Sequence, residues 1–244
     1  MNIELKRALL NNVYASYDKF SKEIRNVCTI GCATCCTQHV AVTTLEADYI
    51  LGWLQERHTL DLLKGLEQIS KDRLSRPAVT TNELAYKCLN QIEPPEEELP
   101  SLSAPCPFLD ETDKTCMIYA VRPFSCRMIF SERKCDEVGH AILDPIVLTI
   151  NSTLLQVVEH IDAGGLFANM IDMLLLLGDR ENLDNYRCNE TLQHSSGFLR
   201  NRLLPGFIIP PEHEHKTLSA LNQLYNSEVR NTTFRDIIMG TGSK

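Results

Sequence analysis

Two groups of cysteines are the residues most able to do chemistry in this chain. The first group is Cys28, Cys32, Cys35 and Cys36, and the second group is Cys106, Cys116, Cys126 and Cys135. The first group fits within nine consecutive residues, whereas eight or nine residues separate each cysteine of the second group from the next. Metal bonds that contribute strongly to folding can offset the entropy of closing such loops. The sequence therefore predicts that both groups supply thiolate ligands to metal.

The metal could be zinc or iron. Cysteine-only zinc sites typically use pairs separated by two to four residues, and the second group has no such pair. Widely spaced thiolates and the Cys106–Pro107 dipeptide favour an iron–sulfur cluster, such as a four-iron cluster, over zinc. Eight thiolates could hold two clusters or two zinc ions, so the number of centres stays open. The neighbours Cys35 and Cys36 point in different directions, so they could serve two metals, or one could be a ligand beside a packed or reactive thiol.

Other uses of the first group fit less well. Cys28, Cys32 and Cys35 have the spacing of a radical S-adenosylmethionine loop, but Thr34 stands where those enzymes usually have an aromatic residue. A thioredoxin-like site needs a strand before the cysteine pair and a helix after it, and the sequence predicts the reverse order. A disulfide framework is typical of small secreted proteins, and this chain is neither small nor expected to be exported.

Composition and charge indicate where the protein is located and which classes of partner it binds. The chain has 244 residues, is 43% hydrophobic and has a formal net charge of −8, which argues against nucleic acid as the main partner. The N-terminal residues resemble an amphipathic helix and not a signal peptide, and the apolar stretch "LFANMIDMLLLLG" is too short for a membrane span. We expect a cytoplasmic protein that binds neither nucleic acid nor membrane, and whose partner or substrate is an unidentified protein.

The pattern around the cysteines resembles the bacterial YkgJ-like cysteine-cluster family, described as a zinc- or iron-chelating domain. The resemblance covers about residues 28–135 and rests on the first cysteine group followed by "VAVTTLEADYI", "CPFLD" and "CMIYAVRPFSCR". It implies that all eight cysteines are ligands, and Tyr119, Arg122, Pro123 and Arg127 also match. One departure is that three residues, instead of two, separate Cys28 from Cys32. The family is related to flagellin lysine methylases, which implies S-adenosylmethionine-dependent modification of a protein side chain as an alternative.

Several residues near and beyond the cysteines have competing interpretations. Arg122 and Arg127 flank Cys126, where they could hydrogen-bond to thiolate sulfur or simply belong to a turn. Tyr119 is predicted to be a packing residue, and His39 is the histidine placed best to replace a ligand or to donate a hydrogen bond to one. Four further residues are excluded from the site: Cys88, predicted to be buried on a helix, Cys188, and the surface histidines His213 and His215.

Hydrophobic periodicity predicts a mainly α fold in which helices are joined by cysteine-rich metal-binding loops, with little β structure. Helices are expected up to about residue 25, from the capping box Thr43–Glu46 through Trp53, over residues 59–74, and from the capping box Thr80–Glu83 to about Ile92. A short strand is expected over "HVAVTT", a linker over "EPPEEELPSLSAP", one or two helices over residues 147–178 broken near Gly164, and a last helix over 216–230.

The domain organisation follows from the position of the cysteines. Residues 1–140 are predicted to form the metal-binding domain, and residues 141–244 a helical region that could pack against it as one domain.

Three functions remain open: a metal protein with a redox, regulatory or accessory role, an S-adenosylmethionine-dependent methylase that uses an iron–sulfur cluster, and a zinc-stabilised interaction module. The sequence does not decide whether the protein is an enzyme.

Overall fold

The computed structural model describes residues 1–71, 74–96 and 104–240, and this part of the chain is mainly α with little β, as predicted. Its α-helices are α1 (Ile3–Ser21), α2 (Thr44–Glu56), α3 (Leu66–Lys71), α4 (Thr81–Leu89), α5 (Phe124–Arg127), α6 (Cys135–Val138), α7 (Pro145–Ile161), α8 (Met170–Gly178), α9 (Arg180–Arg187), α10 (Glu214–Tyr225) and α11 (Phe234–Ile238). Its 3₁₀ helices are η1 (Leu60–Leu63), η2 (Tyr119–Val121) and η3 (Pro211–His213). Its strands are β1 (Ala41–Thr43), β2 (Leu166–Asn169), β3 (Leu199–Arg200), β4 (Glu228–Val229) and β5 (Thr232–Thr233).

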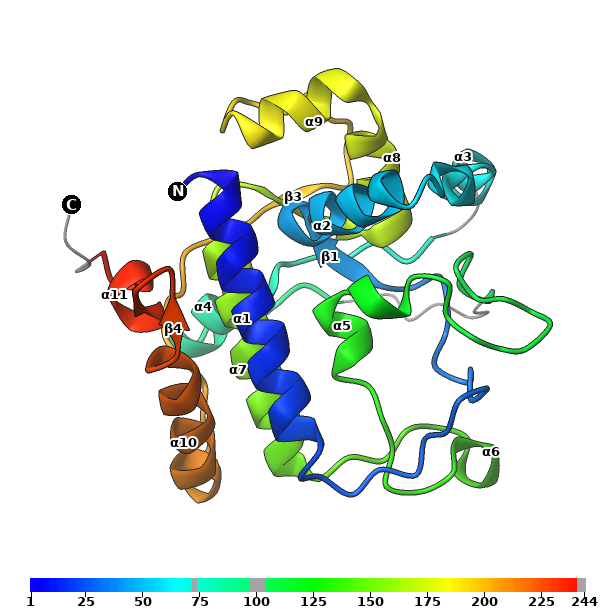
Figure 1. The fold of residues 1–244 in the computed structure, drawn as a ribbon. Coiled ribbons are helices and arrows are strands. Elements are labelled where there is room, and N and C mark those ends of the chain that lie inside the picture. The colour runs from blue at the N-terminus through cyan, green and yellow to red at the C-terminus, as the bar shows by residue number, and fades with distance from the viewer. Residues whose placement is uncertain (72–73, 97–103, 241–244) are drawn as a thin grey trace.

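The long helix α1 lies along α7 and also contacts α10 (Figure 1). Its apolar residues recur every three or four positions and bury one face of the helix, as the periodicity predicts. The buried apolar residues of α1 are Leu9, Leu10, Val13, Tyr14 and Tyr17. The helix ends at Ser21, four residues before the predicted end, because the chain tightens into a turn in which Glu23 N donates to Phe20 O at 3.1 Å.

Both predicted capping boxes start a helix. At α2, Glu46 N donates to Thr43 Oγ1 at 3.2 Å, and Thr43 N donates back to the Glu46 carboxylate at 3.0 Å. At α4, Glu83 N donates to Thr80 Oγ1 at 3.1 Å, although the helix ends at Leu89 and not near residue 92. The helix predicted over 59–74 is divided into η1 and α3, because Gly65 between them has a φ of +88°.

A small antiparallel sheet joins distant parts of the chain in the order β1–β2–β3. Ala41 pairs with Asn169, and Phe167 of β2 pairs with Leu199 of β3. The strand predicted over residues 39–44 is therefore present but shorter, since Thr44 already belongs to α2. The pairing of β1 with β2 crosses residue 140, and one cluster of buried apolar side chains includes residues from both sides of that position. A division into domains at residue 140 stays a prediction.

The C-terminal half differs in detail from the prediction. Residues 147–178 form α7 and α8 with a break near Gly164, as expected, but the strand β2 lies between these helices. The last predicted helix corresponds to α10, which ends at Tyr225 and is followed by the hairpin β4–β5. The short helices α9 and α11 were not predicted. Part of the predicted linker, residues 97–103, lies outside the described residues.

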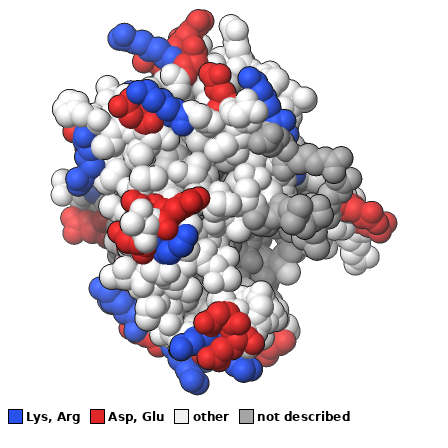
Figure 2. Space-filling model, turned by 90° about the vertical axis from the view of Figure 1, so that its right-hand side faces the viewer, with Lys and Arg blue, Asp and Glu red and all other residues white. Residues whose placement is uncertain are grey.

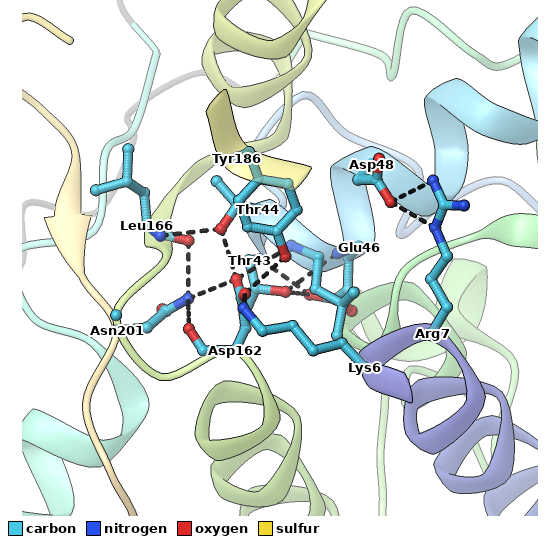
Figure 3. A network of polar contacts seen from close by, with 12 residues as sticks. Lys6, Arg7, Thr43, Thr44, Glu46, Asp48, Asp162, Leu166, Tyr186 and Asn201 are labelled. Carbon is cyan, nitrogen blue, oxygen red and sulfur yellow. Dashed lines mark hydrogen bonds and ion pairs between the residues drawn. The ribbon is translucent and has the colours of Figure 1, made fainter. Parts of the chain in front are cut away.

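A buried polar network connects the elements that meet at the end of α7 (Figure 3). Asp162 is fully buried and accepts hydrogen bonds from Lys6 Nζ at 3.0 Å and from Tyr186 Oη at 2.7 Å. Its second oxygen accepts from Thr44 Oγ1 at 2.5 Å and from Asn201 Nδ2 at 2.9 Å. Because both carboxylate oxygens accept hydrogen bonds and Lys6 supplies the opposite charge, this buried charge is compensated and fixes α1, α2, α7 and α9 to one another.

In the described residues, no helix is both long enough and apolar enough to cross a membrane.

Candidate metal centre

Both cysteine groups lie on one side of the molecule, away from α10 and α11, mostly in irregular segments, with Cys126 in α5 and Cys135 at the start of α6 (Figure 1). The backbone joins these segments although about seventy residues separate them in sequence. Cys106 N donates to Cys36 O at 3.0 Å, and Gln38 N donates to Ala104 O at 3.1 Å. Thr37 and Pro105 face each other as an isolated antiparallel bridge. The end of the first cysteine group is thus held against the start of the second.

The short helix α5, which carries Cys126, is fixed to the rigid helices behind it. Phe124 N donates to Glu46 Oε1 at 2.8 Å, and Ser125 Oγ donates to Ala41 O at 2.8 Å. The Phe124 ring is fully buried and packs edge-on against Tyr17 at 4.8 Å between centroids. These contacts give Cys126 a defined position relative to α1, α2 and β1.

Cys106 and Cys116 lie on the two arms of one tight hairpin-like loop. Met117 N donates to Phe108 O at 2.8 Å, and Leu109 faces Cys116 as an isolated antiparallel bridge. The Phe108 side chain is fully buried, so the loop is attached to the core between its two cysteines. The loop therefore presents both thiols from the same side of the molecule as Cys36.

Cys28 and Cys135 are brought together by a separate crossing of the chain. Val27 N donates to Ser131 O at 2.9 Å, and the Ser131 N–H forms a hydrogen bond with the Cys28 thiol. Ser131 is fully buried, and its hydroxyl accepts a hydrogen bond from Ile142 N at 2.9 Å. This arrangement anchors the entry to the first cysteine group beside the segment that leads into α6, where Cys135 is buried.

The first cysteine group folds into consecutive tight turns. Cys32 N donates to Thr29 O at 3.0 Å, and Cys36 N donates to Ala33 O at 2.9 Å. Gly31 has a φ of +87°, a conformation that favours glycine and that lets the chain reverse between Cys28 and Cys32. The loop is compact enough to present several thiols, with Cys28, Cys32 and Cys35 exposed and Cys36 half-buried.

Charge interactions among the thiols cross between the two sequence groups. Cys36 interacts with three thiols of the second group, namely Cys106, Cys116 and Cys126. Cys28 interacts with Cys32 and Cys35 of its own group and with Cys135 of the second. The two cysteine groups therefore mix in space, and each of these neighbourhoods contains thiols from both.

Burial and hydrogen bonding shift the pKa values of these thiols. Burial raises the pKa of Cys106 to about 11 and raises that of Cys126 further above its ordinary value. A hydrogen bond between the Cys35 and Cys36 thiols lowers the pKa of Cys36 and raises that of Cys35. Thiolates gathered here need a positive charge nearby, which a bound metal ion provides.

The donor set fits zinc or iron. All eight cysteines are free thiols, and thiolate is the preferred ligand of structural zinc and of iron–sulfur clusters. As placed in the described parts of the chain, no three Cys, His, Asp or Glu side chains converge closely enough to hold an ion. Metal binding would therefore draw neighbouring thiols together.

Arg122 and Arg127 have different surroundings. The Arg122 guanidinium lies over the Tyr119 ring at 4.0 Å and interacts electrostatically with Cys35, Cys116 and Cys126. Its Nε is buried and has no hydrogen-bond partner in the described residues, so this N–H is available to donate to a thiolate.

Arg127 instead donates to the carbonyl oxygens of Arg122 and Ala120 and to the Asp18 carboxylate. It also lies over the Tyr14 ring at 4.2 Å. These hydrogen bonds direct the Arg127 donors at oxygen atoms and not at sulfur. The side chain stabilises the α5 loop because its donors are used on that loop and on α1.

The remaining candidates are two further cysteines and three histidines. Cys88 is exposed, and the prediction that it is buried is wrong, because Leu84 on the same helix and Ile92 beyond its end are themselves 40% and 44% exposed. Cys188 is exposed as well. His39 Nδ1 accepts from Ser75 N at 3.2 Å, so the neutral ring carries its proton on Nε2 and that nitrogen is a donor, not a metal ligand.

His213 Nδ1 lies 2.8 Å from Thr149 Oγ1, and His215 is exposed, which agrees with their prediction as polar surface residues.

Sequence reasoning missed two residues that position the thiols. Glu46 was recognised as a helix cap, but it also accepts from Tyr14 Oη at 3.0 Å and from the N-terminus of α5. Ser131 carried no motif, since a lone serine between cysteines gives no signal in sequence. The "LEADYI" segment that contains Glu46 was the available clue, because it belongs to the pattern that resembles the cysteine-cluster family.

Residues 27–141, just under half of the chain, match the family model CxxCxxCC, described as "Putative zinc- or iron-chelating domain". The matched segment contains all eight cysteines of the two groups, which confirms the resemblance to a cysteine-cluster family seen in the sequence. Searches among curated proteins and among solved structures found no match.

Proposed function

We propose, on the premise that residues 27–141 match a zinc- or iron-chelating domain, that this protein binds iron–sulfur clusters through the thiolates of its eight grouped cysteines. The observation that carries the proposal is the backbone pairing of Cys36 with Cys106, supported by the interaction of Cys28 with Cys135. Folding gathers thiols from both ends of the matched segment. A segment that gathers free thiols is suited to metal binding.

Ligand type and spacing favour iron–sulfur over zinc. The cysteines of the second group have no close partner in sequence, which is unusual for a cysteine-only zinc site. Hydrogen bonds to cluster sulfur and burial tune iron–sulfur centres, and the unpartnered Arg122 Nε could supply such a bond. A zinc-stabilised interaction module is the second candidate, and it predicts a colourless protein without acid-labile sulfide.

The role that follows is redox, regulatory or accessory, exercised on a protein partner. On the face drawn in Figure 2, the coloured charged residues form separate groups of both signs with uncharged surface between them. This surface supports a protein partner over nucleic acid, for which a continuous basic patch is typical. A methylase that uses S-adenosylmethionine remains a prediction from the family relationship, and calorimetric titration of the metal-loaded protein with S-adenosylmethionine tests it.

The test of metal binding compares Cys126→Ser with Cys188→Ser. Cys126 lies among the grouped thiols, whereas Cys188 is exposed and lies outside residues 27–141, so only Cys126→Ser should lower the metal bound per chain. Removing the metal from the wild type with a chelator should also lower the melting temperature, because a metal that binds only the folded state stabilises it. Full metal content in Cys126→Ser, or an unchanged melting temperature after complete metal removal, would contradict the proposal.

A further inference from the structure

A cavity of about 300 Å³ lies at the end of the molecule where α1 begins and α9 ends, away from the cysteine segments (Figure 1). Its walls are the turn after α7 at residues 163–166, the chain after α9 between residues 189 and 194, and Arg200 at the end of β3. No described residue of its lining belongs to residues 27–141. The cavity is therefore separate from the candidate metal centre.

The buried network around Asp162 forms the floor of this cavity. Gly165 lies so close to the network that a Cβ there would overlap the Asp162 carboxylate. Lys6 and Tyr186, which line the cavity and contact Asp162, are 6% and 5% exposed (Figure 3). The floor is thus polar and is fixed in place by hydrogen bonds from α1, α2 and α9.

The Lys6 ammonium has more hydrogen-bond donors than the protein uses. An ammonium carries three N–H groups, and the described residues supply one acceptor to it, Asp162 Oδ1 at 3.0 Å. A buried donor of a charged group is costly when it has no acceptor. The other N–H groups of Lys6 therefore require acceptors from the contents of the cavity.

Asp162 leaves this ammonium available because its own charge is well solvated by other donors. Besides Lys6, its two oxygens accept from Tyr186 Oη, Thr44 Oγ1, Leu45 N and Asn201 Nδ2. A second acceptor beside Lys6 would therefore not deprive the buried carboxylate of its hydrogen bonds.

Donors also surround the mouth of the cavity. Arg200 Nη1 donates to Gly164 O at 3.1 Å, which holds the guanidinium beside the turn, and its other N–H groups have no acceptor in the part of the chain that the structure describes. Asn189 and Thr191 add an exposed amide and an exposed hydroxyl to the lining. Glu190 is the one carboxylate among the described lining side chains.

The charges and the volume indicate the class of ligand. Two lining side chains, Lys6 and Arg200, are positive and one, Glu190, is negative, so a single carboxylate balances them. Carboxylates form charge-assisted hydrogen bonds with ammonium and guanidinium groups. Leu166 and Leu192 supply apolar wall for a short hydrocarbon part. A volume at the lower end of the range for small-molecule sites, which begins at about 300 Å³, fits a compact ligand.

We propose that this cavity binds a small molecule with one carboxylate and a short hydrocarbon part. The carboxylate accepts from the Lys6 ammonium at the floor, and Arg200 attracts it at the mouth. The hydrocarbon part lies against Leu166 and Leu192. This site goes beyond the proposed metal binding and does not depend on it.

The test is an NMR titration of the full-length ¹⁵N-labelled protein with n-butyrate, a short monocarboxylate. Butylamine, which has a similar size and the opposite charge, is the control ligand, and inorganic phosphate tests a different anion. We expect butyrate to shift the backbone amides of Gly164, Gly165 and Thr191 with a saturable dependence on concentration, and butylamine to leave them unchanged.

Two variants and one matched control identify the groups that bind. Lys6→Met should abolish the saturable shifts, and its amide spectrum shows whether it folds. Arg200→Gln removes an exposed charge, so we expect it to fold and to weaken butyrate binding by about threefold. Arg180→Gln removes a 95% exposed guanidinium from α9 outside the cavity, and we expect it to leave the affinity unchanged.

Shifts that do not saturate, or that butylamine reproduces, would overturn the proposal and leave a cavity filled by water. Saturable binding of phosphate without butyrate binding would overturn the carboxylate class. Unchanged affinity in a folded Lys6→Met, or an equal loss in Arg200→Gln and Arg180→Gln, would overturn the assigned residues. Metal content plays no part in these readouts, so their outcome is separable from that of the metal-binding test.

Discussion

Replacing Glu46 with glutamine tests how the helices hold the thiol-bearing loop. Glu46 is 2% exposed. Its two oxygens accept from the backbone N–H groups of Thr43 at 3.0 Å and Phe124 at 2.8 Å, and from the hydroxyls of Thr43 and Tyr14. A glutamine has one oxygen and one amide nitrogen. The hydroxyls can turn to accept from that nitrogen, but one of the two backbone N–H groups must lose its acceptor whichever way the amide is oriented.

The expected loss of unfolding free energy follows from this one unpaired backbone N–H group. One buried donor without a partner costs about 1–3 kcal/mol, so we expect Glu46→Gln to lower the free energy of unfolding by about 2 kcal/mol. For a chain of this size, that loss corresponds to a fall in melting temperature of roughly 4–8 °C. Urea unfolding measures the free energy of unfolding, and thermal unfolding measures the melting temperature. Both use the metal-free protein, so that metal binding does not contribute to either value.

The matched control is Glu83→Gln, since Glu83 occupies the same position in the second Thr-x-x-Glu capping box. Its side chain is 28% exposed and its main partner is the Arg202 guanidinium at 2.9 Å, so we expect a loss below about 1 kcal/mol. Glu46→Gln should in addition speed the alkylation of Cys126, because α5 loses an anchor. The reasoning is refuted if the two variants are equally stable, or if Glu46→Gln destabilises the protein while Cys126 stays as protected as in the wild type.

Three further predictions concern the scaffold. Gly165→Ala should cost about 1–3 kcal/mol in urea unfolding, because a Cβ there would overlap the Asp162 carboxylate, whereas Gly178→Ala, with open space around it, should be neutral. Asp162→Asn should cost about 3–5 kcal/mol because it leaves Lys6 buried without its ion-pair partner, and adding Lys6→Met should recover part of that loss; additive effects in the double-mutant cycle would contradict this. Burial lowers the pKa of His160, so the unfolded state takes up a proton first and stability should fall as the pH drops below about 6.5; a His160→Gln variant with the same decrease in urea midpoint would refute the assignment.

The Thr-x-x-Glu capping boxes predicted where α2 and α4 begin, but no pattern in the sequence predicted the short strand β2 between α7 and α8. The capping boxes at Thr43 and Thr80 could be read from sequence because the threonine and glutamate stand at a fixed spacing. Strand β2 could not, since its four residues are all buried and run directly into the apolar helix α8. A short apolar run without alternation has the same appearance in a buried strand and in a buried helix.

The eight cysteines were predictable as a group, but the contact between the two groups was not. Sequence spacing groups Cys36 with Cys35, whereas the structure pairs the backbone of Cys36 with that of Cys106. That pairing depends on how the core places α5 and the loop around Phe108. Tertiary packing determines this placement, and the spacing of cysteines in the sequence does not. The failed prediction for Cys88 has a similar origin, because periodicity identifies an apolar face but not whether another element covers it.

The most direct test of the account is the content of iron, zinc and acid-labile sulfide per chain in protein purified without oxygen. We predict iron with an equal amount of sulfide. The metal should depend on Cys126 and not on Cys188. Zinc without sulfide would contradict the iron–sulfur assignment and favour the zinc-stabilised module, and the absence of both metals would contradict the account as a whole.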